Sequence, residues 1–567
     1  MIKPLLWGLL AAALAACASV DSASTLVSDD GWVTVDGQPQ GMARRSADAA
    51  QAGMDVGTTT GPDAAVGGPI GTPGPGLGLV LPGALNASKF RELVQAGVVP
   101  SAQDLPMEGW FNEHDTPLPQ ASPERPVDLH AIAAIIAEPN QEPEVLLQIG
   151  FNTAASLAAL QPNLKLVVAV DRSASLGPQS LAAVKAGILD IADSLPAQSA
   201  LAVVMFDAGT EEVFAASPYT SALKGQLVAS LSGIKSQGGT DLYGGLQFAV
   251  ERLGKLQSNA KQQRILLATD GAGTLGEHGA ADFVDLAKKA GVSVSSIGVG
   301  LQVNGALLTN LAKVTGGTYY EAPTQTALQQ AFSKDLISLL VPVAANLSVA
   351  IQLGNGWSVR DAFGLPFDTV GGTLYLGKAS KPAVGDVAAS DVVAVPDALA
   401  GDTLAPDNGA PPPDPVLGQL YPSQRNGLIA IRLQPPSGTV IDTGLALLLA
   451  KATWSYTLTA SGTKQSHEKL VEVNGLFAVP DGGYEYFTHP VARRTAAIVR
   501  AGEAMKAACA QAFNGNKAAA VATVQAAMAF MGRMDPEVKK AGLDPSGALD
   551  AAHGLMQKLV DNLQANK

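Results

Sequence analysis

The sequence predicts a multidomain protein in which a doubly wound α/β domain is inserted in a β-sandwich and followed by a C-terminal helical bundle. Residues 162–340 alternate near-continuous apolar strands with amphipathic helices, which is typical of a mostly parallel sheet covered on both faces. In residues 341–487 the helical periodicity disappears, and β-like runs alternate with glycine and proline turns. Helical periodicity returns in residues 488–567. These changes indicate an α/β region, an all-β region and an all-α region.

The α/β region is expected to contain six strands connected by helices. Its strand-like runs are short and apolar, as buried parallel strands are, and they cover residues 164–170, 200–207, 211–216, 264–270, 292–300 and 317–322. The clearest helical pattern runs from Pro178 to Leu195, where apolar residues recur at spacings of three and four and a proline stands near the first turn. Further helical patterns cover residues 241–253 and 324–340. This alternation predicts the doubly wound sheet.

The β-like segments lie on both sides of the α/β domain. Two strand-like runs, residues 127–137 and 144–153, precede it and need pairing partners. Strands after the α/β domain could supply them, because the two ends of a domain often lie close together. We therefore expect one β-sandwich to be shared by residues 87–161, which also carry a short N-terminal helix, and residues 341–487.

The C-terminal region, residues 488–567, reads as a small helical bundle. Its helical pattern falls into three pieces, and alanine at many interface positions indicates close helix packing. The dipeptides Asn514-Gly515 and Asp535-Pro536 are turn signals and mark the expected breaks between the pieces.

The N-terminus has the layout of an export signal. Residues 1–16 contain one cation, Lys3, and an apolar run from Leu5 to Ala15 that is shorter than the roughly 20 residues a transmembrane helix needs. Leu14-Ala15-Ala16-Cys17 resembles the bacterial lipobox, which implies cleavage before Cys17 and a lipid on its sulfur. The alternative is a plain secretory leader with a cysteine near the cut. By resemblance to sorting in Gram-negative bacteria, Ala18 implies delivery to the outer membrane.

The mature chain is expected to be held at the membrane by this lipid alone. Residues 17–86 are small, polar and rich in glycine and proline, a composition that predicts a disordered tether. No later window is apolar and long enough to span a membrane. The second cysteine, Cys509, would have no disulfide partner once Cys17 is acylated. The formal net charge of −13, without a local basic patch, excludes nucleic acid as a partner.

Short oxygen-bearing side chains follow the ends of the predicted parallel strands. Asp171, Ser173 and Ser175 come directly after the first strand, and Asp270 ends the strand RILLATD. Thr240 follows two glycines that let its loop approach closely. Because open α/β sheets bind ligands at the carboxyl ends of their strands, these five groups are expected to share one ion.

The chemistry of the five groups favours a hard cation. All are oxygen ligands, and no Cys or His cluster accompanies them. Mg²⁺ is therefore expected rather than zinc, and Mn²⁺ and Ca²⁺ are the alternatives to Mg²⁺. Three of the five ligands are neutral hydroxyls, which leave the ion short of negative charge. A cation in this site would therefore bind an additional anionic ligand from outside.

These residues resemble the metal-ion-dependent adhesion site of von Willebrand factor type A (VWA) domains. The resemblance rests on the DxSxS motif at Asp171, Ser173 and Ser175, on Thr240, and on Asp270, set in the expected strand order. It implies that the serines and threonine contact the metal and that a partner's Asp or Glu completes its shell. It also implies that the terminal helix, residues 324–340, shifts on ligand capture.

The sequence also departs from the family pattern beside the motif. Ala174 and Leu176 stand where Gly and Met are common in the family, and Arg172 places a cation inside the loop. Arg172 is expected to point outward, because a metal ion would repel it. Outside this domain, the segments SKFRELVQAGVVP and EGWFNEHDTPLP, the β region and the helical end resemble a group of bacterial VWA-containing lipoproteins.

Three other interpretations compete with a partner-binding metal site. The serines and aspartates could merely cap helices and close turns. The chain could be a metal-independent structural scaffold of the cell envelope. A bound Mg²⁺ could also activate water for hydrolysis. No GxSxG, HExxH or Walker-type motif supports an enzyme, and the expected function is protein binding without catalysis.

Overall fold

The computed structural model describes residues 77–565, with gaps at 115, 123, 137–143, 156–162, 261, 271–277, 334–339, 364–366, 371, 377–417, 424–426, 437–445, 475–489 and 545. The predicted signal peptide, Cys17 and most of the predicted tether lie outside the described residues. Within the described part of the chain, no helix combines the length and apolar character needed to cross a membrane.

The α/β domain is built on a seven-stranded sheet with the order β2-β10-β9-β8-β5-β6-β7. Every neighbouring pair is parallel except β6 and β7. Six strands lie where the apolar runs predict them, and the seventh, β2, comes from much earlier in the chain. The strands are β2 (Gly83–Ala84), β5 (Leu164–Asp171), β6 (Ala200–Phe206), β7 (Thr210–Ala216), β8 (Gln262–Thr269), β9 (Ser293–Val299) and β10 (Thr318–Ala322).

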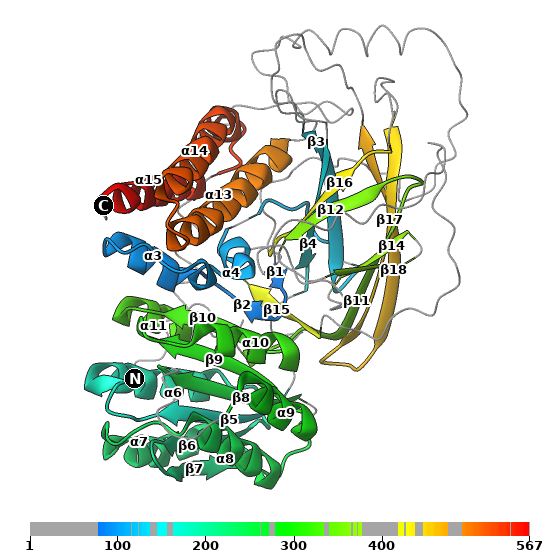
Figure 1. Ribbon diagram of the computed structural model, residues 1–567. Helices are drawn as coiled ribbons and strands as arrows, with labels where there is room; N and C mark the ends of the chain where they lie inside the picture. The colour runs from blue at the N-terminus through cyan, green and yellow to red at the C-terminus, as the bar shows by residue number, and fades with distance from the viewer. Residues whose placement is uncertain are drawn as a thin grey trace, which may run out of the picture. The chain divides into compact units, whose positions relative to one another are not determined.

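Helices cover both faces of this sheet (Figure 1). Val167 and Val168 are adjacent on β5 and belong to two different apolar clusters, because successive side chains of a strand point to opposite faces. Ile188 of α6 and Phe332 of α11 pack in one cluster, and Leu246 of α8 packs in the other. The helices are α6 (Gly177–Ser194), η2 (Ser221–Leu223), α7 (Lys224–Ser232), α8 (Leu242–Lys255), α9 (Ala280–Ala290), α10 (Gly305–Thr315) and α11 (Gln325–Ser333).

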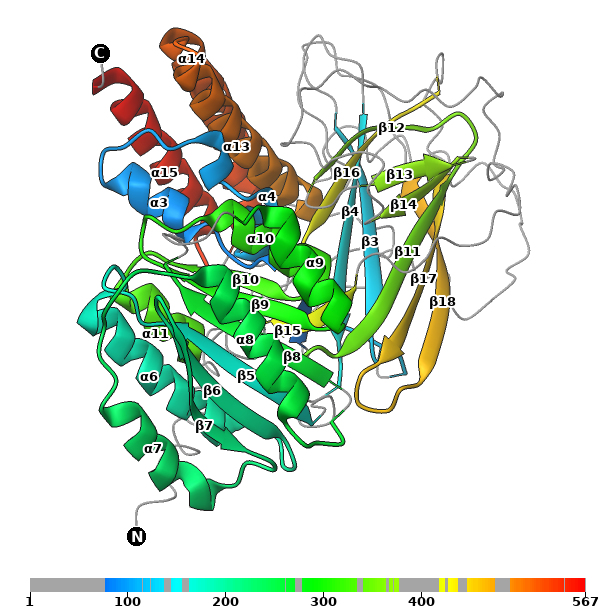
Figure 2. The ribbon, with the colours of Figure 1, turned by 60° about the horizontal axis from the view of Figure 1, so that its bottom comes forward.

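The β region joins strands from before and after the α/β domain in one 11-stranded sheet (Figure 2). β4 pairs with β16, and β1 pairs with both β4 and β15, so the two flanks do supply each other's partners. The strands are β1 (Leu77–Val80), β3 (Asp128–Ile136), β4 (Glu144–Thr153), β11 (Ala344–Leu353), β12 (Ser358–Phe363), β13 (Phe367–Val370), β14 (Thr373–Leu376), β15 (Gln419–Ser423), β16 (Ile429–Gln434), β17 (Ala446–Leu458) and β18 (Lys464–Asn474).

The sheet curls so that strands distant in its order meet. Just before β3, the N–H of Val127 donates to the Tyr456 hydroxyl of β17 (3.2 Å), and Trp454 Nε1 donates to Val127 O (3.4 Å). One apolar cluster contains residues of β3, β4, β11 and β17 together. The insertion of the α/β domain into a two-layer sandwich stays a prediction.

Strands β1 and β2 correct the expected extent of the tether, which was placed at residues 17–86. Both lie within this range, and they join the two sheets one after the other: β1 inserts between β4 and β15, and β2 adds to β10. They are only four and two residues long. The composition of residues 17–86 did not indicate these two strands, because their hydrogen-bonding partners lie far along the chain.

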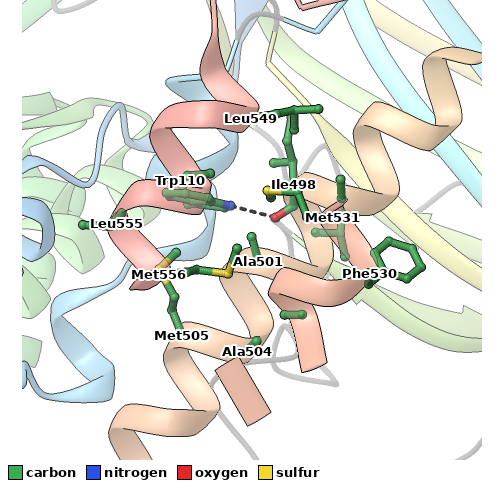
Figure 3. Packing of buried hydrophobic residues seen from close by; sticks show 14 of the residues in the cluster. Trp110, Ile498, Ala501, Ala504, Met505, Phe530, Met531, Leu549, Leu555 and Met556 are labelled. Carbon is green, nitrogen blue, oxygen red and sulfur yellow. Dashed lines mark hydrogen bonds between the residues drawn. The ribbon is translucent and has the colours of Figure 1, made fainter. Parts of the chain in front are cut away.

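The C-terminal helices pack together with helices from the N-terminal flank. Trp110 of α4 donates from Nε1 to the backbone oxygen of Ile498 in α13 (2.9 Å), and one apolar core surrounds this contact (Figure 3). The helices are α3 (Ser88–Gln95), η1 (Ala102–Asp104), α4 (Met107–Asn112), α13 (Pro490–Phe513), α14 (Lys517–Lys540) and α15 (Ala548–Ala565). The region is therefore not a separate bundle.

The break expected at Asp535-Pro536 is wrong. Helix α14 continues through Pro536 to Lys540. Two features keep the last turn helical despite the missing N–H of the proline. Met534 and Val538 are buried in the apolar core on either side of it, and Lys539 Nζ forms an ion pair with Asp535 Oδ2 at 2.8 Å.

Candidate metal centre

The DxSxS loop leaves the carboxyl end of β5 and gathers three oxygen-bearing side chains. Asp171 is fully buried, and its Oδ1 accepts a hydrogen bond from the Ser173 N–H at 2.8 Å. The Ser173 and Ser175 hydroxyl oxygens lie 3.0 Å apart. Ser173 is buried, whereas Ser175 is exposed. The loop thus presents an oxygen-lined surface that solvent can reach.

The loop that carries Thr240 is fastened to the DxSxS loop by its backbone. Ala174 N–H donates to Gly238 O (3.3 Å), and Gln237 N–H donates to Arg172 O (2.8 Å). Gly238 has a φ of +72°, a conformation that a residue with a side chain adopts only with strain. Thr240 is buried at the end of this loop, just before α8 begins.

Asp270 follows β8 and faces the same region as Asp171. The residue before it, Thr269, donates from Oγ1 to Asp171 Oδ2 at 2.8 Å. Burial raises the pKa of Asp171 above its usual value, and the charge of Asp270 raises it further, against hydrogen bonds from Ser173 and Thr269 that lower it. Two buried carboxylates of like charge therefore lie close together, an arrangement that a cation would stabilise.

Arg172 is directed to carboxylates on the neighbouring strands. Its Nε lies 3.0 Å from Asp207 Oδ2, and its guanidinium also pairs with Glu211 at 2.7 Å. Although burial by itself raises the pKa of Asp207, hydrogen bonds from the Gly209 N–H and Gln237 and the charge of Arg172 hold it below its usual value. Arg172 is thus held by two acids, and its orientation away from a metal ion stays a prediction.

Two residues that support this site were not singled out from the sequence. Thr269 orients Asp171, and Asp207 holds both Arg172 and the Thr240 loop, since Asp207 O accepts from the Asp241 N–H at 2.7 Å. Asp207 ends the run ALAVVMFD just as Asp171 ends its own strand. Aspartate recurs at the ends of the predicted strands, and this pattern in the sequence could have indicated Asp207.

The chemistry of the donors fits a hard divalent cation. Within the described ranges, no group of three or more His, Cys, Asp and Glu side chains is placed to hold a metal ion. A cation at this edge would depend on hydroxyl oxygens beside two carboxylates, which is a ligand set suited to Mg²⁺. Asp171, Ser173, Ser175, Thr240 and Asp270 are the residues that could hold it.

Aromatic side chains lie beside the loops at this edge. Tyr243, in the first turn of α8, stacks on His278 with ring centroids 3.7 Å apart. His278 follows Asp270 in sequence, and its neighbour Glu277 lies outside the described residues. His467 is far away in β18, where its Nε2 is 3.3 Å from the Tyr456 hydroxyl.

Comparison with known proteins confirms the VWA domain. Residues 165–334 match the family model described as von Willebrand factor type A domain. VWA domains typically mediate protein–protein interactions, often through a metal-ion-dependent adhesion site. The chain is 24% identical over 280 residues to "Uncharacterized protein YfbK" of Escherichia coli (strain K12). The match covers 48% of each protein, so the chain spans about half the length of this curated relative.

The solved structures to which the chain is similar are distant. A von Willebrand factor type A protein from Catenulispora acidiphila is 14% identical, with 76% of this chain and 91% of the other covered at a TM-score of 0.45. The ArnB paralog VWA2 from Sulfolobus acidocaldarius is also 14% identical, with coverages of 77% and 98% and a TM-score of 0.42. Proximal thread matrix protein 1 from the mussel byssus, with a zinc-occupied MIDAS motif, is 20% identical, with coverages of 32% and 47% and a TM-score of 0.27.

Proposed function

We propose that this chain is a lipid-anchored lipoprotein of the bacterial cell envelope, at the outer membrane, that binds a protein partner through a divalent cation. The cation is Mg²⁺, with Mn²⁺ or Ca²⁺ as alternatives. Its ligands would be Asp171, Ser173, Ser175, Thr240 and Asp270. An Asp or Glu carboxylate of the partner would complete the shell. The function is binding and not catalysis.

One observation carries this proposal: buried carboxylates and serine hydroxyls converge at the end of β5. Asp171 is linked to Ser173 and Thr269 by hydrogen bonds of 2.8 Å, and Ser175 extends the set to the exposed surface. If these groups only capped helices and closed turns, the like charge of Asp270 beside Asp171 would serve only to raise the pKa of Asp171. A bound cation supplies the charge that balances both acids and attracts the partner's carboxylate.

Titration calorimetry of the purified protein with Mg²⁺ and Mn²⁺ tests the metal site. Ser175→Ala removes an exposed hydroxyl and should weaken binding about 10–100-fold without affecting folding. Ser221→Ala, at the exposed start of η2, is the matched control and should bind as the wild type does. Absence of saturable binding to the wild-type protein would contradict the metal site.

A pull-down from envelope extract separates metal-dependent partner binding from a scaffold role. The expected result is a captured protein that is released by EDTA and recaptured when excess Mg²⁺ is added. Ser175→Ala should capture less of the same protein at equal bait. Capture that is insensitive to EDTA and to Ser175→Ala would favour the metal-independent scaffold.

The proposed anchor is tested separately, because it does not depend on the metal. Cys17→Ser should prevent lipid attachment and leave an uncleaved precursor that migrates more slowly, since the thiol is the acceptor. Cys509→Ala is the control and should mature normally. Normal lipid labelling and cleavage of Cys17→Ser would refute the lipobox.

A further inference from the structure

A cavity lies at the same edge of the seven-stranded sheet as the candidate metal centre, but away from it. A cavity of about 660 Å³ lies between α10 and β10 of the VWA domain and the segment from α3 to α4, with α13 also contributing to its wall. Ligand cavities have about this volume and often lie where domains meet. The carboxyl ends of β9 and β10 border it, and open α/β sheets bind ligands at the carboxyl ends of their strands.

The walls of this cavity carry charges of both signs from several elements. Lys89 Nζ of α3 pairs with Asp104 Oδ1 of η1 at 2.9 Å. Lys313 Nζ of α10 pairs with Glu108 Oε1 of α4 at 2.5 Å. Lys506 of α13 adds a third ammonium group, which donates to a backbone oxygen at 3.3 Å. A lining with both signs suits a ligand that itself carries both signs.

Glu321 of β10 is the buried acid in this wall. The residue is 2% exposed, and Oε2 accepts a hydrogen bond from the Lys89 backbone N–H at 2.8 Å. Burial raises the pKa of Glu321 to about 8. The charge of Lys89 already favours the ionised form of this carboxylate, and an ammonium group placed in the cavity would favour it further.

The N-terminus of α10, in contrast to Glu321, is suited to an anionic group of a ligand. Asn304 caps this 11-residue helix, its Oδ1 accepting from the Leu307 N–H at 3.1 Å, and Asn304 and Gly305 both line the cavity. The first turn of a helix favours a negative charge. Behind Gly305 lies the fully buried Tyr319 hydroxyl, 3.2 Å from where a Cβ on Gly305 would be, and it has no hydrogen-bond partner among the described residues.

We propose that this cavity binds a small zwitterion of amino-acid or short-peptide chemistry. The ligand's ammonium group is held at Glu321, and its carboxylate is held at the first turn of α10 with Lys506 nearby. Such a ligand would contact the VWA domain and the flanking helices at once. The site shares no residue with the metal centre and does not depend on the proposed function.

Titration calorimetry of the purified protein with alanine, dialanine and trialanine tests this site and separates an amino acid from a peptide as ligand. At least one of them should bind saturably. N-acetylation or C-terminal amidation of that compound should each weaken binding about tenfold or more, because each removes one charge. Lack of saturable binding by all three, or equal binding of the capped forms, would overturn the proposal.

Two variants locate the binding. Glu321→Gln keeps the shape but removes the charge and should weaken binding about tenfold. Ala306→Trp starts from an exposed position on α10 and should fill the cavity and abolish binding. Ala229→Trp, at an exposed position of α7, is the matched control and should bind normally. Undiminished binding by folded Ala306→Trp would place the ligand elsewhere and overturn the proposal.

Discussion

The VWA domain buries charge in two regions, and the two regions balance it differently. At the metal edge, which is the sheet edge formed by the ends of β5 and β8, Asp171 and Asp270 carry charge of the same sign, and the charge of Asp270 raises the pKa of Asp171. At the seam, where residues 77–95 and β15 meet the VWA sheet, the buried ionisable side chains are Arg264 and Glu321. Those two are surrounded by hydrogen-bonding groups from the flanks.

The buried polar groups of the seam bond to groups that are far away in sequence. The Arg264 guanidinium donates to the Tyr421 hydroxyl and to the Gln419 side chain of β15. Glu321 has its backbone N–H and C=O bonded to the Asn86 side-chain amide at 2.8 and 2.9 Å. The seam groups thus take their hydrogen-bond partners from within the chain, whereas the like charges at the metal edge favour a cation from outside. The comparison predicts that seam variants alter stability and that edge variants alter binding.

The largest effect is expected at the seam, from the pH dependence of Glu321. Its pKa is about 8 in the folded protein and about 4.5 when unfolded, so the folded state holds the proton more tightly. Its stabilising contribution is complete below pH 4.5 and is lost as pH rises through 8. The free energy of unfolding should fall by about 3–5 kcal/mol over this range.

Urea unfolding of wild type and Glu321→Gln at several pH values measures this loss. The difference between the two proteins isolates Glu321 from His114, whose burial lowers its pKa to about 4 and gives the opposite slope below pH 6.5. Parallel curves for wild type and variant would show that Glu321 is not a buried acid.

At the metal edge the next largest effect is expected, and it concerns binding. Asp171→Asn keeps the acceptor for the Ser173 N–H but removes the charge that repels Asp270. Affinity for Mg²⁺ should fall at least about 100-fold, or about 2.7 kcal/mol, while the unfolding free energy without metal changes by less than about 1 kcal/mol. Calorimetry and urea unfolding check the two values. A large loss of stability with unchanged affinity would assign Asp171 a purely structural role.

The sequence allowed prediction of the VWA sheet and of the strand ends that carry Asp171 and Asp270, because both depend on local signals. Each strand is a short apolar run, and Asp171 and Asp270 stand at or just after the ends of two of these runs. The parallel arrangement then brings the strand ends together without any knowledge of distant pairing. The supporting contacts of Thr269 and Asp207 required the register of neighbouring strands.

The seam could not be predicted because its contacts join residues that are far apart and of ordinary type. Asn86 and Glu321 are separated by 235 positions, and Arg264 and Tyr421 by 157. β1 and β2 carry too few residues to show periodicity, so their composition alone indicated a tether. Burial of Arg264 became evident only when β15 was placed against β8.

Removing one hydroxyl at the seam should destabilise the protein without changing the metal edge. Tyr421 accepts from Arg264 and donates to Gly316 O at 2.7 Å. Tyr421→Phe leaves both groups short of a partner and should cost about 2 kcal/mol in urea unfolding, with Mg²⁺ affinity unchanged. Tyr375→Phe, on half-buried β14, is the control. A change within about 0.5 kcal/mol for Tyr421→Phe would show that Arg264 is satisfied without it.

The smallest effect concerns the contact between α6 and the terminal helix, which belongs to neither region. Gly187 of α6 packs directly against Phe332 of α11, and a Cβ on Gly187 would lie 2.2 Å from the Phe332 ring. Gly187→Ala should therefore overpack this contact and cost about 1–2 kcal/mol. Gly254→Ala, in α8 with open space around it, is the control and should stabilise slightly.

The cause of that loss can be separated from a change in helix propensity. Alanine favours the helix over glycine, so a loss in Gly187→Ala must come from the collision with Phe332. Adding Phe332→Leu, which shortens the opposing side chain, should recover part of the lost stability. If the terminal helix shifts on ligand capture as the VWA resemblance implies, Gly187→Ala should also alter partner affinity in the pull-down while Mg²⁺ affinity stays the same. Unchanged capture alongside the expected destabilisation would show that this helix takes no part in binding.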